Sequence, residues 1–252
     1  MLPVYAGSIF LEGGKYMSNN RLSKRLKTIA DLAPVSDVIA DIGTDHGFLA
    51  IYAVESGKAK KVYACDIAKK PLEQARDQIN SAGVQERIET LLGPGLKPLS
   101  GKKVNGVVIA GMGGYTIKTI LENDTELVND LNFLVLQPQN NSKLLRSWLI
   151  ENNERIVKER LVLENGFIYQ ILKAVKGKSE EYSEIELEYG KLEHFDEVEL
   201  YKLNIKRDIQ HYESIIKQMP KGKNNDIIKK RNDFTEKIDF ITSPVWQIAS
   251  DK

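Results

Sequence analysis

The sequence predicts an α/β fold in which a mostly parallel sheet carries helices on both faces, followed by a smaller helical unit. Three observations support this prediction. Short apolar, strand-like runs alternate with helix-like segments over the first part of the chain. An Asn-Gly pair then joins two longer strand-like runs, at residues 153–163 and 167–176. Beyond residue 178 the composition changes to Glu, Lys, Leu and Ile with few glycines.

Size and composition allow one sizeable core with a smaller appended unit, because the chain has 252 residues and a formal net charge of +1. No run approaches the ~20 apolar residues that a membrane helix needs, so we expect no membrane partner. The single cysteine, Cys65, excludes a disulfide framework and predicts a cytoplasmic protein. Residues 179–252 hold 16 acidic and 12 basic residues, while the rest is mildly basic, which permits a polyanionic partner without requiring one.

The start of the chain is apolar but has no preceding basic residues, so it does not predict a signal peptide. Met17, followed by SNNRLSKRL, has the pattern of a natural start, and residues 1–16 are interpreted as an extension with little structural role. We therefore expect an N-terminal extension at 1–19, an α/β domain at 20–178 and a helical hairpin at 179–252.

The first helix is expected at residues 20–32, where Leu22, Leu26 and Ile29 share one face and Pro34 follows. Strands are then predicted at 38–42, 61–66, 87–92, 104–110 and 131–137, and helices at 46–57, 70–82, 114–122 and 142–151. This alternation favours a parallel sheet. Two further helices, at 196–218 and 225–241, flank the turn MPKGKNN and are expected to pack as an antiparallel pair.

The turn Glu164-Asn165-Gly166 lies between the two longer strand-like runs and is a strong short hairpin signal. A parallel sheet that finishes with an antiparallel hairpin is unlike a plain dinucleotide-binding fold. It is the pattern of class I methyltransferases, in which the last strand inserts antiparallel.

The stretch DIGTDHG, residues 41–47, follows the first predicted strand. Gly43 allows a sharp turn, and Gly47 allows the next helix to begin close by. The free N–H groups at such a helix start would serve the carboxylate and sugar of S-adenosylmethionine. Two spaced glycines can equally form a purely structural turn, and the spacing alone does not separate these two interpretations.

Asp66 ends the next predicted strand, 25 positions after Asp41. An acid at this place can accept both ribose hydroxyls of an adenosyl cofactor. A cap for the following helix is the alternative, but the glycine loop and the spacing together favour ribose binding.

Two more strand ends carry candidate ligand-binding segments. AGMGG, residues 110–114, exposes backbone with almost no side-chain cover, against which a flat ring could lie; the alternative is a flexible turn. In LQPQNN, residues 136–141, Pro138 stiffens the turn while Gln137 and Gln139 offer donors and acceptors suited to the edge of a base. A polar loop is nearly as good an interpretation of that segment.

The pair Asp45-His46 interrupts the glycine loop. A metal site is not expected, because the chain has only three histidines, two of them in the predicted helical tail, and no metal-binding motif. Asp45 can be a helix N-cap, or its charge can point into the active site. His46 can be a partly buried helix residue.

Six segments together resemble one family, the TrmK-type tRNA (adenine-N1)-methyltransferases, which are bacterial enzymes that modify adenine 22 of tRNA. These segments are LSKRLKTIADL, DIGTDHGFLAIYAV, VYACDIAKKPLEQA, VVIAGMGGYTIKTIL, LVLQPQNNSKLLRSWL and VLENGFIYQI. The resemblance runs from about residue 20 to the C-terminus. It implies a class I methyltransferase domain with a C-terminal coiled-coil-like unit, S-adenosylmethionine as cofactor and tRNA as partner.

The resemblance also implies roles for individual residues. The pair expected beside the transferred methyl group is Asp45 and His46. The residues expected to bind the cofactor are Asp41, Gly43, Thr44, Gly47, Asp66, Ile67, Gly93, Gly95, Ala110, Gly111, Met112 and Gly113. The residues expected to bind the substrate are Arg25, Gly114, Gln137 and Pro138. The family commonly reads G-D-G-L where this chain has Gly93-Pro94-Gly95-Leu96, so backbone groups are expected to replace an acid facing the cofactor adenine.

The resulting hypothesis is methyl transfer from S-adenosylmethionine to N1 of a tRNA adenine, with Asp45 stabilising the developing charge or taking the N6 proton. N1 lies on the pairing edge, so the base must leave its stack. Basic residues of the first helix, Arg21, Lys24, Arg25 and Lys27, and the segment KGKNNDIIKKR are candidates for contacts with tRNA.

Three other functions stay open. They are methylation of another RNA base or a small molecule, RNA binding without catalysis, and NAD(P)-dependent oxidoreduction. The Asn-Gly hairpin and the absence of a full G-x-G-x-x-G weigh against the last of these. The oligomeric state is left open between a monomer and a weak dimer.

Overall fold

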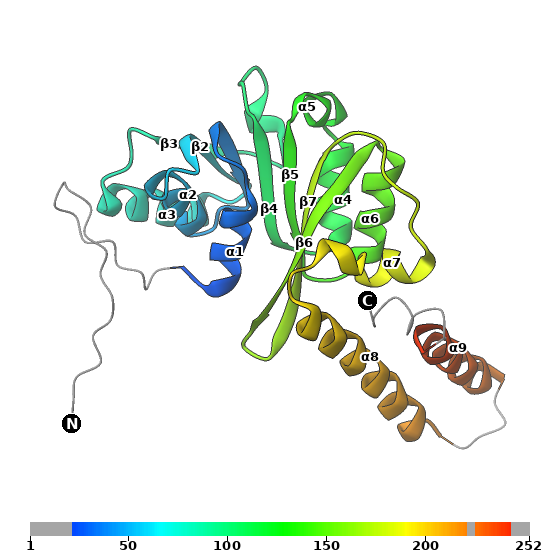
Figure 1. Ribbon diagram of the computed structural model, residues 1–252. Coiled ribbons are helices and arrows are strands. Elements are labelled where there is room, and N and C mark those ends of the chain that lie inside the picture. The colour runs from blue at the N-terminus through cyan, green and yellow to red at the C-terminus, as the bar shows by residue number, and fades with distance from the viewer. Residues whose placement is uncertain (1–21, 221–224, 243–252) are drawn as a thin grey trace, which may run out of the picture.

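The computed structural model describes residues 22–220 and 225–242. The extension expected at 1–19, Arg21 and the start of the KGKNNDIIKKR segment lie outside the described residues. A seven-stranded sheet in the order β3-β2-β1-β4-β5-β7-β6 forms the centre of the molecule (Figure 1). The strands are β1 (Ser36–Ile42), β2 (Ala59–Asp66), β3 (Ile88–Leu92), β4 (Gly106–Met112), β5 (Phe133–Pro138), β6 (Glu154–Glu164) and β7 (Phe167–Lys176).

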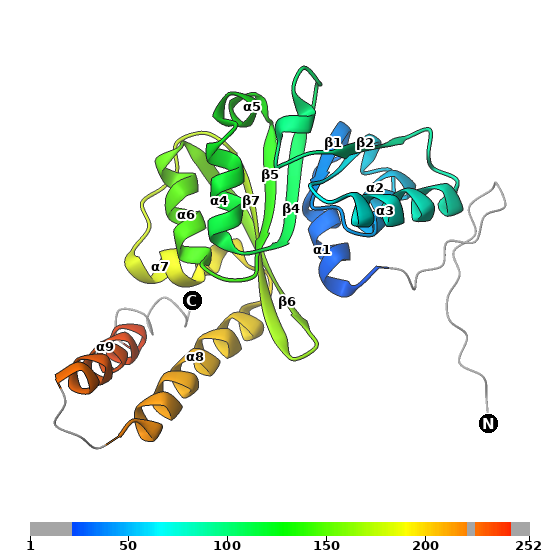
Figure 2. The same ribbon diagram turned by 180° about the vertical axis from the view of Figure 1, so that it is seen from behind.

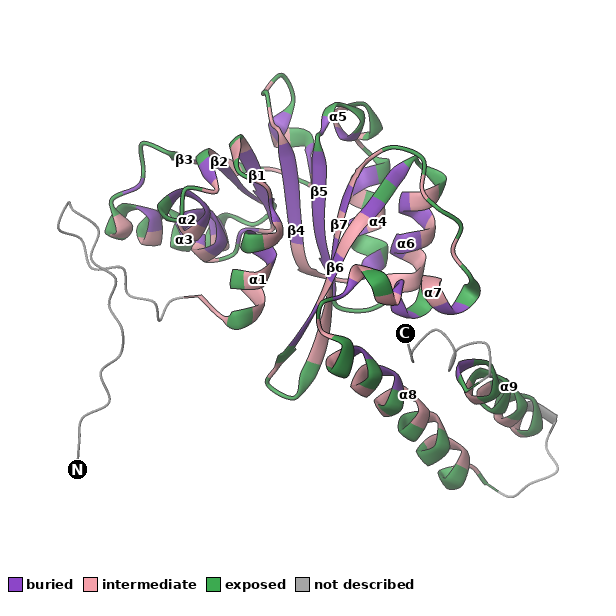
Figure 3. Cartoon of the chain, in the orientation of Figure 1, coloured by how far each residue is buried: buried purple, intermediate pink, exposed green. Residues whose placement is uncertain are grey.

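Helices cover both faces of the sheet, as the alternation of elements predicts (Figure 2). One face packs against α1 (Lys24–Leu32), α2 (Phe48–Glu55) and α3 (Lys69–Ala82). The other packs against α4 (Gly114–Glu122), α5 (Thr125–Asp130) and α6 (Ser142–Glu151). The central strands are almost wholly buried because both of their faces are covered, which explains their near-continuous apolar sequence (Figure 3).

The last two strands confirm the predicted antiparallel ending of the sheet. Strand β7 pairs antiparallel with β5, from Leu134↔Ala174 to Leu136↔Leu172, and with β6 along its whole length. Both central residues of the connecting turn, Asn165 and Gly166, have positive φ, of 51° and 82°. This backbone matches the twist of a two-residue hairpin, and it explains why Asn-Gly was an informative signal.

The C-terminal part contains α7 (Glu184–Tyr189), α8 (Val198–Gln218) and α9 (Asn225–Ile241). Helices α8 and α9 lie side by side and extend away from the sheet, so most of their surface is exposed (Figure 3). Their bounds agree with the predicted helices at 196–218 and 225–241, whereas α5 and α7 were not predicted. A small third core joins Tyr189, Tyr201 and Ile205 to Leu161 of β6. Among the residues described, no helix is both long and apolar enough to cross a membrane.

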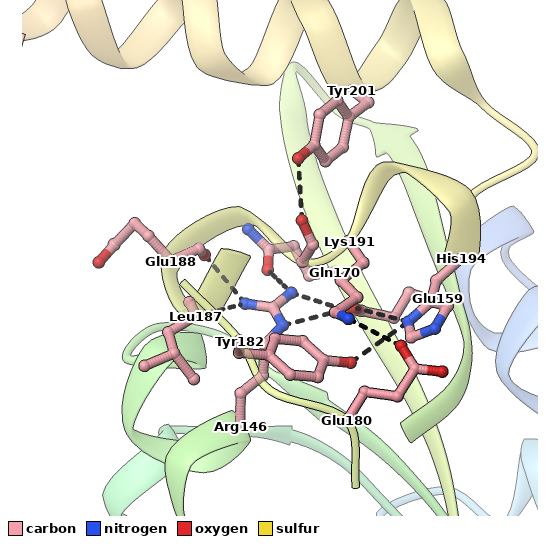
Figure 4. Close-up of polar contacts among 11 residues, drawn as sticks. Arg146, Glu159, Gln170, Glu180, Tyr182, Leu187, Glu188, Lys191, His194 and Tyr201 are labelled. Atoms are coloured by element: carbon pink, nitrogen blue, oxygen red, sulfur yellow. Dashed lines mark hydrogen bonds and ion pairs between the residues drawn. The ribbon is translucent and has the colours of Figure 1, made fainter. Parts of the chain in front are cut away.

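A buried polar cluster fastens α7 to the sheet (Figure 4). The guanidinium of Arg146, on α6, donates to Glu159 Oε2 from Nη2 at 2.6 Å and from Nε at 3.1 Å. The same group donates to Gln170 Oε1 at 2.7 Å. Its Nη1 donates to the carbonyl oxygens of Leu187 and Glu188, at 3.0 and 2.9 Å. We call Arg146 with these four partners the arginine junction.

The arginine junction is wholly enclosed at its centre, since the side chains of Arg146 and Glu159 have no exposed surface. Taking both charges out of water is costly, and the two hydrogen bonds that converge on Glu159 Oε2, with the additional carbonyl acceptors, offset part of that cost. Glu159 Oε1 is buried without a hydrogen-bond partner and lies 3.8 Å from His194 Nδ1. Because the two carbonyls belong to the end of α7, the ion pair also fixes where the C-terminal helices leave the sheet. Tyr201 of α8 adds a buried hydrogen bond to the Gly190 carbonyl, at 2.9 Å.

Candidate active site

The carboxyl ends of the four central parallel strands meet at one edge of the sheet, and the predicted site segments lie at that edge. Strand β1 leads into the DIGTDHG loop, β2 ends at Asp66, β4 ends in the AGMGG segment and β5 ends at Pro138. In register, Ile42 lies opposite Cys65, and Ala110 opposite Gln137. This edge is the usual place for a ligand in an open α/β sheet.

The start of the β1–α2 loop is held tightly against β2. The backbone N–H groups of Gly43 and Thr44 both donate to the Cys65 carbonyl, at 2.8 and 3.0 Å. Gly43 has φ of +76°, and a Cβ at this position would collide with the terminal methyl of Met112. The positive φ is what favours glycine here, because the Met112 methyl is the end of a flexible side chain that can move aside.

Beneath the loop lies a buried carboxylate. Asp41 Oδ2 accepts a 2.7 Å hydrogen bond from the Thr44 hydroxyl, and both side chains are buried. Burial raises the pKa of Asp41 to about 6, the Thr44 bond opposes this shift, and the nearby Asp66 charge adds to it. A cation placed here would favour the ionised carboxylate.

Asp45 and His46 project into the mouth of the site. Asp45 has φ of +50° and a side chain that is 70% exposed, with Oδ2 3.6 Å from His46 Nε2. The His46 ring stacks on Phe48 at a centroid distance of 5.6 Å. The N-cap of α2 is Gly47, so Asp45 is not the helix cap that the sequence left open. A non-glycine residue in the left-handed region is uncommon, and at this position it directs a carboxylate toward solvent at the cavity mouth.

Asp66 has one carboxylate oxygen engaged locally, because Oδ1 accepts from the Ala68 N–H at 2.9 Å. The N-cap of α3 is Ala68 rather than Asp66. Asp66 nonetheless lines two neighbouring cavities, which also share Gly43 and Met112. The carboxylate thus stands at the junction of a two-part site.

The two cavities differ in character. The first, about 320 Å³, is mainly apolar and is lined by Ile42, Gly43, Cys65, Asp66, Ile67, Gly93, Pro94, Gly95, Lys97, Met112, Thr116, Ile120, Asn123 and Asp124. The second, about 460 Å³, is more polar and is lined by Arg25, Leu26, Asp41, Gly43, Thr44, Asp45, His46, Phe48, Leu49, Asp66, Ala110, Gly111, Met112 and Gln139. An apolar slot with glycine backbone suits a flat heterocycle, and the polar part can hold charged groups.

Arg25 of α1 reaches into the polar cavity and is held there by three elements. Its Nη1 donates to Gln137 Oε1 at 2.6 Å, and its Nε lies 3.5 Å from Glu164 Oε2. Its guanidinium lies over the Tyr169 ring, 4.9 Å from the centroid. Gln137 is itself buried and accepts from the Gly111 N–H at 3.2 Å. Gln137 therefore orients Arg25 and β4, while Gln139 is the glutamine that lines the polar cavity.

Three of the predicted glycines lie outside the lining of both cavities. Gly47, with φ of +71°, packs against Ala75 of α3, 3.2 Å from where a Cβ would lie. Gly113 and Gly114 face the turn after β5, and a Cβ on Gly114 would lie 2.7 Å from the Asn140 carbonyl oxygen. These glycines let α2 and α4 begin close to their neighbours. Pro138 lines a further hollow beside the polar cavity.

Glu164 and Tyr169 belong to the site but were not singled out from the sequence. Both lie at the β6–β7 turn, far in sequence from Arg25, which they hold. The available signal was the alternation of Phe167 and Tyr169 in a strand, which places both rings on one face. Within residues 22–220 and 225–242, no three His, Cys, Asp or Glu side chains gather as a metal site would require.

Comparisons with known proteins agree on one group. A sequence profile described as "Methyltransferase domain" matches residues 22–172. The tRNA (adenine(22)-N(1))-methyltransferase of Bacillus subtilis (strain 168) is 32% identical over 220 residues, which cover 85% of this chain and 92% of that protein. The structure of Mycoplasma capricolum TrmK with S-adenosyl-homocysteine has a TM-score of 0.75 and 33% identity, covering 87% of this chain and 99% of the other. A Streptococcus pneumoniae structure described as a putative tRNA (m1A22) methyltransferase with S-adenosyl-L-methionine has a TM-score of 0.74 and 26% identity, covering 86% and 99%.

Proposed function

This chain belongs to the tRNA (adenine(22)-N1)-methyltransferase family, and from that premise we propose how its residues perform the reaction. The protein transfers a methyl group from S-adenosylmethionine to N1 of adenine 22 in tRNA. We assign roles to individual residues from the two-part site, in which an apolar slot and a polar cavity meet at Gly43, Asp66 and Met112.

The cofactor is assigned across both parts of that site. Asp66 would accept the ribose hydroxyls, and Ile67, Gly93 and Gly95 in the apolar slot would hold the adenine. Asp41 and the β1–α2 loop would hold the amino-acid end. Support comes from the chemistry of the donor set: an acid at a strand end suits a diol, and Gly93 and Gly95, which have no side chains, line the slot on either side of Pro94.

The target adenine is assigned to the polar cavity. S-adenosylmethionine supplies an activated methyl group, so the protein's task is alignment and electrostatic stabilisation. N1 attacks with its own lone pair, and the product ring is cationic. Asp45, at the cavity mouth, stabilises that charge, and His46 beside it limits where the carboxylate can point. An entering base covers the exposed Asp45 side chain and strengthens this interaction by excluding water.

We assign Arg25 to direct binding of the substrate, and not to a basic surface that attracts RNA in general. Its guanidinium is fixed by Gln137, Glu164 and Tyr169, so it presents a plane with little freedom to rearrange. A planar cation of this kind stacks on bases and pairs with phosphates. We also assign the protein to the cytoplasm, in accord with a buried free thiol at Cys65 and a tRNA substrate.

A primer-extension assay tests the function directly, because a methyl group on N1 blocks base pairing. Unmodified tRNA is incubated with the protein and S-adenosylmethionine, and reverse transcription is expected to stop at position 22. The matched control is the same transcript with guanine at that position. A stop on both transcripts, or a stop elsewhere, contradicts the assigned target. Cofactor binding measured by calorimetry without any stop would instead favour a protein that binds RNA without modifying it.

A further inference from the structure

A third hollow, of about 300 Å³, lies beside the polar cavity and plays no part in the reaction as derived above. We call it the hairpin hollow. It is lined by Pro138, Gln139, Asn140, Asn141, Ser142, Phe167, Ile168, Tyr169, Gln170, Glu188, Asn204 and Asp208. Gln139 lines both the hairpin hollow and the polar cavity, so the two are neighbours.

The hollow exists because strand β7 extends beyond the end of its partner, strand β5. Only residues Leu172 to Ala174 of β7 pair with β5, and β5 ends at Pro138. Residues 167–171 of β7 therefore pair in register with β6 alone. In Figure 1 the β6–β7 hairpin projects beyond the ends of β4 and β5, between α1 and α8. Arg207 of α8 steadies the tip by donating to the Gly166 carbonyl at 3.0 Å.

The hairpin hollow carries aromatic rings at its rim. Phe167 is 67% exposed at the hairpin tip, so its ring is available for contact. Its ring lies 6.4 Å from that of Tyr169, with both side chains on the same face of β7. The Tyr169 ring in turn makes a cation–π contact with the guanidinium of Arg25, which lines the polar cavity. Two tilted rings, 51° apart in plane, and the Arg25 guanidinium thus lie in sequence between the hairpin tip and the polar cavity.

The polar groups of the hollow are suited to a base rather than to a phosphate. Five of its lining side chains are amides: Gln139, Asn140, Asn141, Gln170 and Asn204. The Gln170 and Asn140 carbonyl oxygens already accept hydrogen bonds, from Arg146 and Asn141, so these two residues contribute mainly their amide donors. Its lining includes no lysine or arginine, and it includes the carboxylates Glu188 and Asp208. These charges disfavour a phosphate, whereas carboxylates and amides pair well with the amino and imino groups of a base.

We propose that the hairpin hollow binds the base of a nucleotide next to the methylated adenine, stacked against Phe167. This inference rests on the proposed function, because it takes tRNA as the substrate. Extruding an adenine removes stacking from its neighbours, and an aromatic side chain replaces that lost contact. Holding the neighbouring base fixes the RNA backbone on one side of the polar cavity, and so helps to place N1 within reach of the methyl group.

The first test compares Phe167→Ala with Leu163→Ala. Leu163 is a matched control because it lies on the same hairpin, is 39% exposed and does not line the hollow. Phe167→Ala is expected to raise KM for tRNA about 10-fold, since the loss of one base–aromatic stack weakens binding by roughly that factor. Leu163→Ala is expected to leave KM unchanged, and Phe167→Trp to restore it. Equal KM values for Phe167→Ala and Leu163→Ala overturn the proposal.

A second test does not depend on catalysis. tRNA carrying 2-aminopurine immediately before or after the target adenine is titrated with the protein, and the fluorescence of the probe is followed. Stacking on Phe167 is expected to change the fluorescence at one of these positions, and Phe167→Ala to abolish the change. An identical response from wild type and Phe167→Ala overturns the hollow as a base site. A missing stop at position 22 in the primer-extension assay, by contrast, overturns the proposed function.

Discussion

The carboxyl edge of the sheet, where we propose that the cofactor binds and which we call the cofactor edge, and the arginine junction are built in opposite ways. At the edge, glycines and a left-handed Asp45 leave backbone and charge open to solvent. At the junction, Arg146 and Glu159 are sealed from water and every hydrogen-bonding nitrogen of the guanidinium has a partner. The first region is arranged to exchange ligands and the second to hold two parts of the chain in one place. Solvent-exposed backbone and charge mark the site, and a buried ion pair marks the support.

Removing one side of the junction should give the largest effect. Arg146→Met leaves the Glu159 carboxylate buried without its partner, so the free energy of unfolding is expected to fall by about 3–5 kcal/mol. Urea titration measures this loss. The control is Lys143→Met on the same helix, whose exposed pair with Glu184 is worth ~0–1 kcal/mol.

The double variant Arg146→Met, Glu159→Leu should recover part of that stability, because no charge is then left buried. The remaining folded protein should bind S-adenosylhomocysteine as wild type does. An equal loss in Arg146→Met and Lys143→Met would show that the junction does not support the fold as described.

At the cofactor edge the expected effect is on turnover and not on stability. Asp45→Asn keeps the size of the side chain and removes its charge, so methyl transfer should slow about 100-fold or more. Urea unfolding and S-adenosylhomocysteine affinity should match wild type, because Asp45 is exposed and away from the core. Asp37→Asn, an exposed acid at the opposite end of β1, serves as the control. Wild-type turnover in Asp45→Asn removes the role assigned to Asp45.

The smallest expected effect is a pH dependence from Asp41. Its folded pKa of about 6 exceeds the ordinary value of 3.8, so the folded protein binds more protons between these values. Stability should therefore fall as pH rises from about 4 to about 6, with a slope of at most about 1.4 kcal/mol per pH unit, and this contribution should be flat above that range.

Asp41→Asn should flatten this slope while keeping an acceptor for Thr44. Unfolding free energies collected from pH 4 to 7 for both proteins decide the matter. Parallel curves for the two proteins would mean that Asp41 does not titrate in this range. Bound S-adenosylmethionine carries a cationic amino group, and if it lies near Asp41 it should also suppress the slope.

Much of the cofactor edge was predictable because its signals are local. A glycine after a strand, or an acid at a strand end, indicates its position at the edge of the sheet within a few residues, and the parallel sheet follows from the same alternation; the binding roles of these residues stay predictions. The start of α2 was placed two residues early, since Asp45 and Gly47 adopt left-handed backbone before the helix begins at Phe48. The position of Asp66 at the meeting of two cavities follows from the register of β1 and β2.

The arginine junction was not predictable in the same way. In SKLLRSWLIE, Arg146 has the pattern of a surface residue on an amphipathic helix, and its partners lie 13 to 42 positions away. Helix α7 was missed as well, although Ser183 and Glu186 form a capping box that could have indicated its start. Pairing between distant charges depends on the completed fold, and a local pattern does not contain it.

The insertion of β7 between β5 and β6 has a consequence for how the chain is made. Synthesis proceeds from the N-terminus, so β5 emerges from the ribosome well before the strand that covers its free edge. Until residues 167–176 have been added, the nascent protein exposes the hydrogen-bonding edge of a buried apolar strand. A chain released before that point would lack the hairpin and carry an open edge suited to pairing with other chains. Translation must therefore pass Lys176 before the sheet can close.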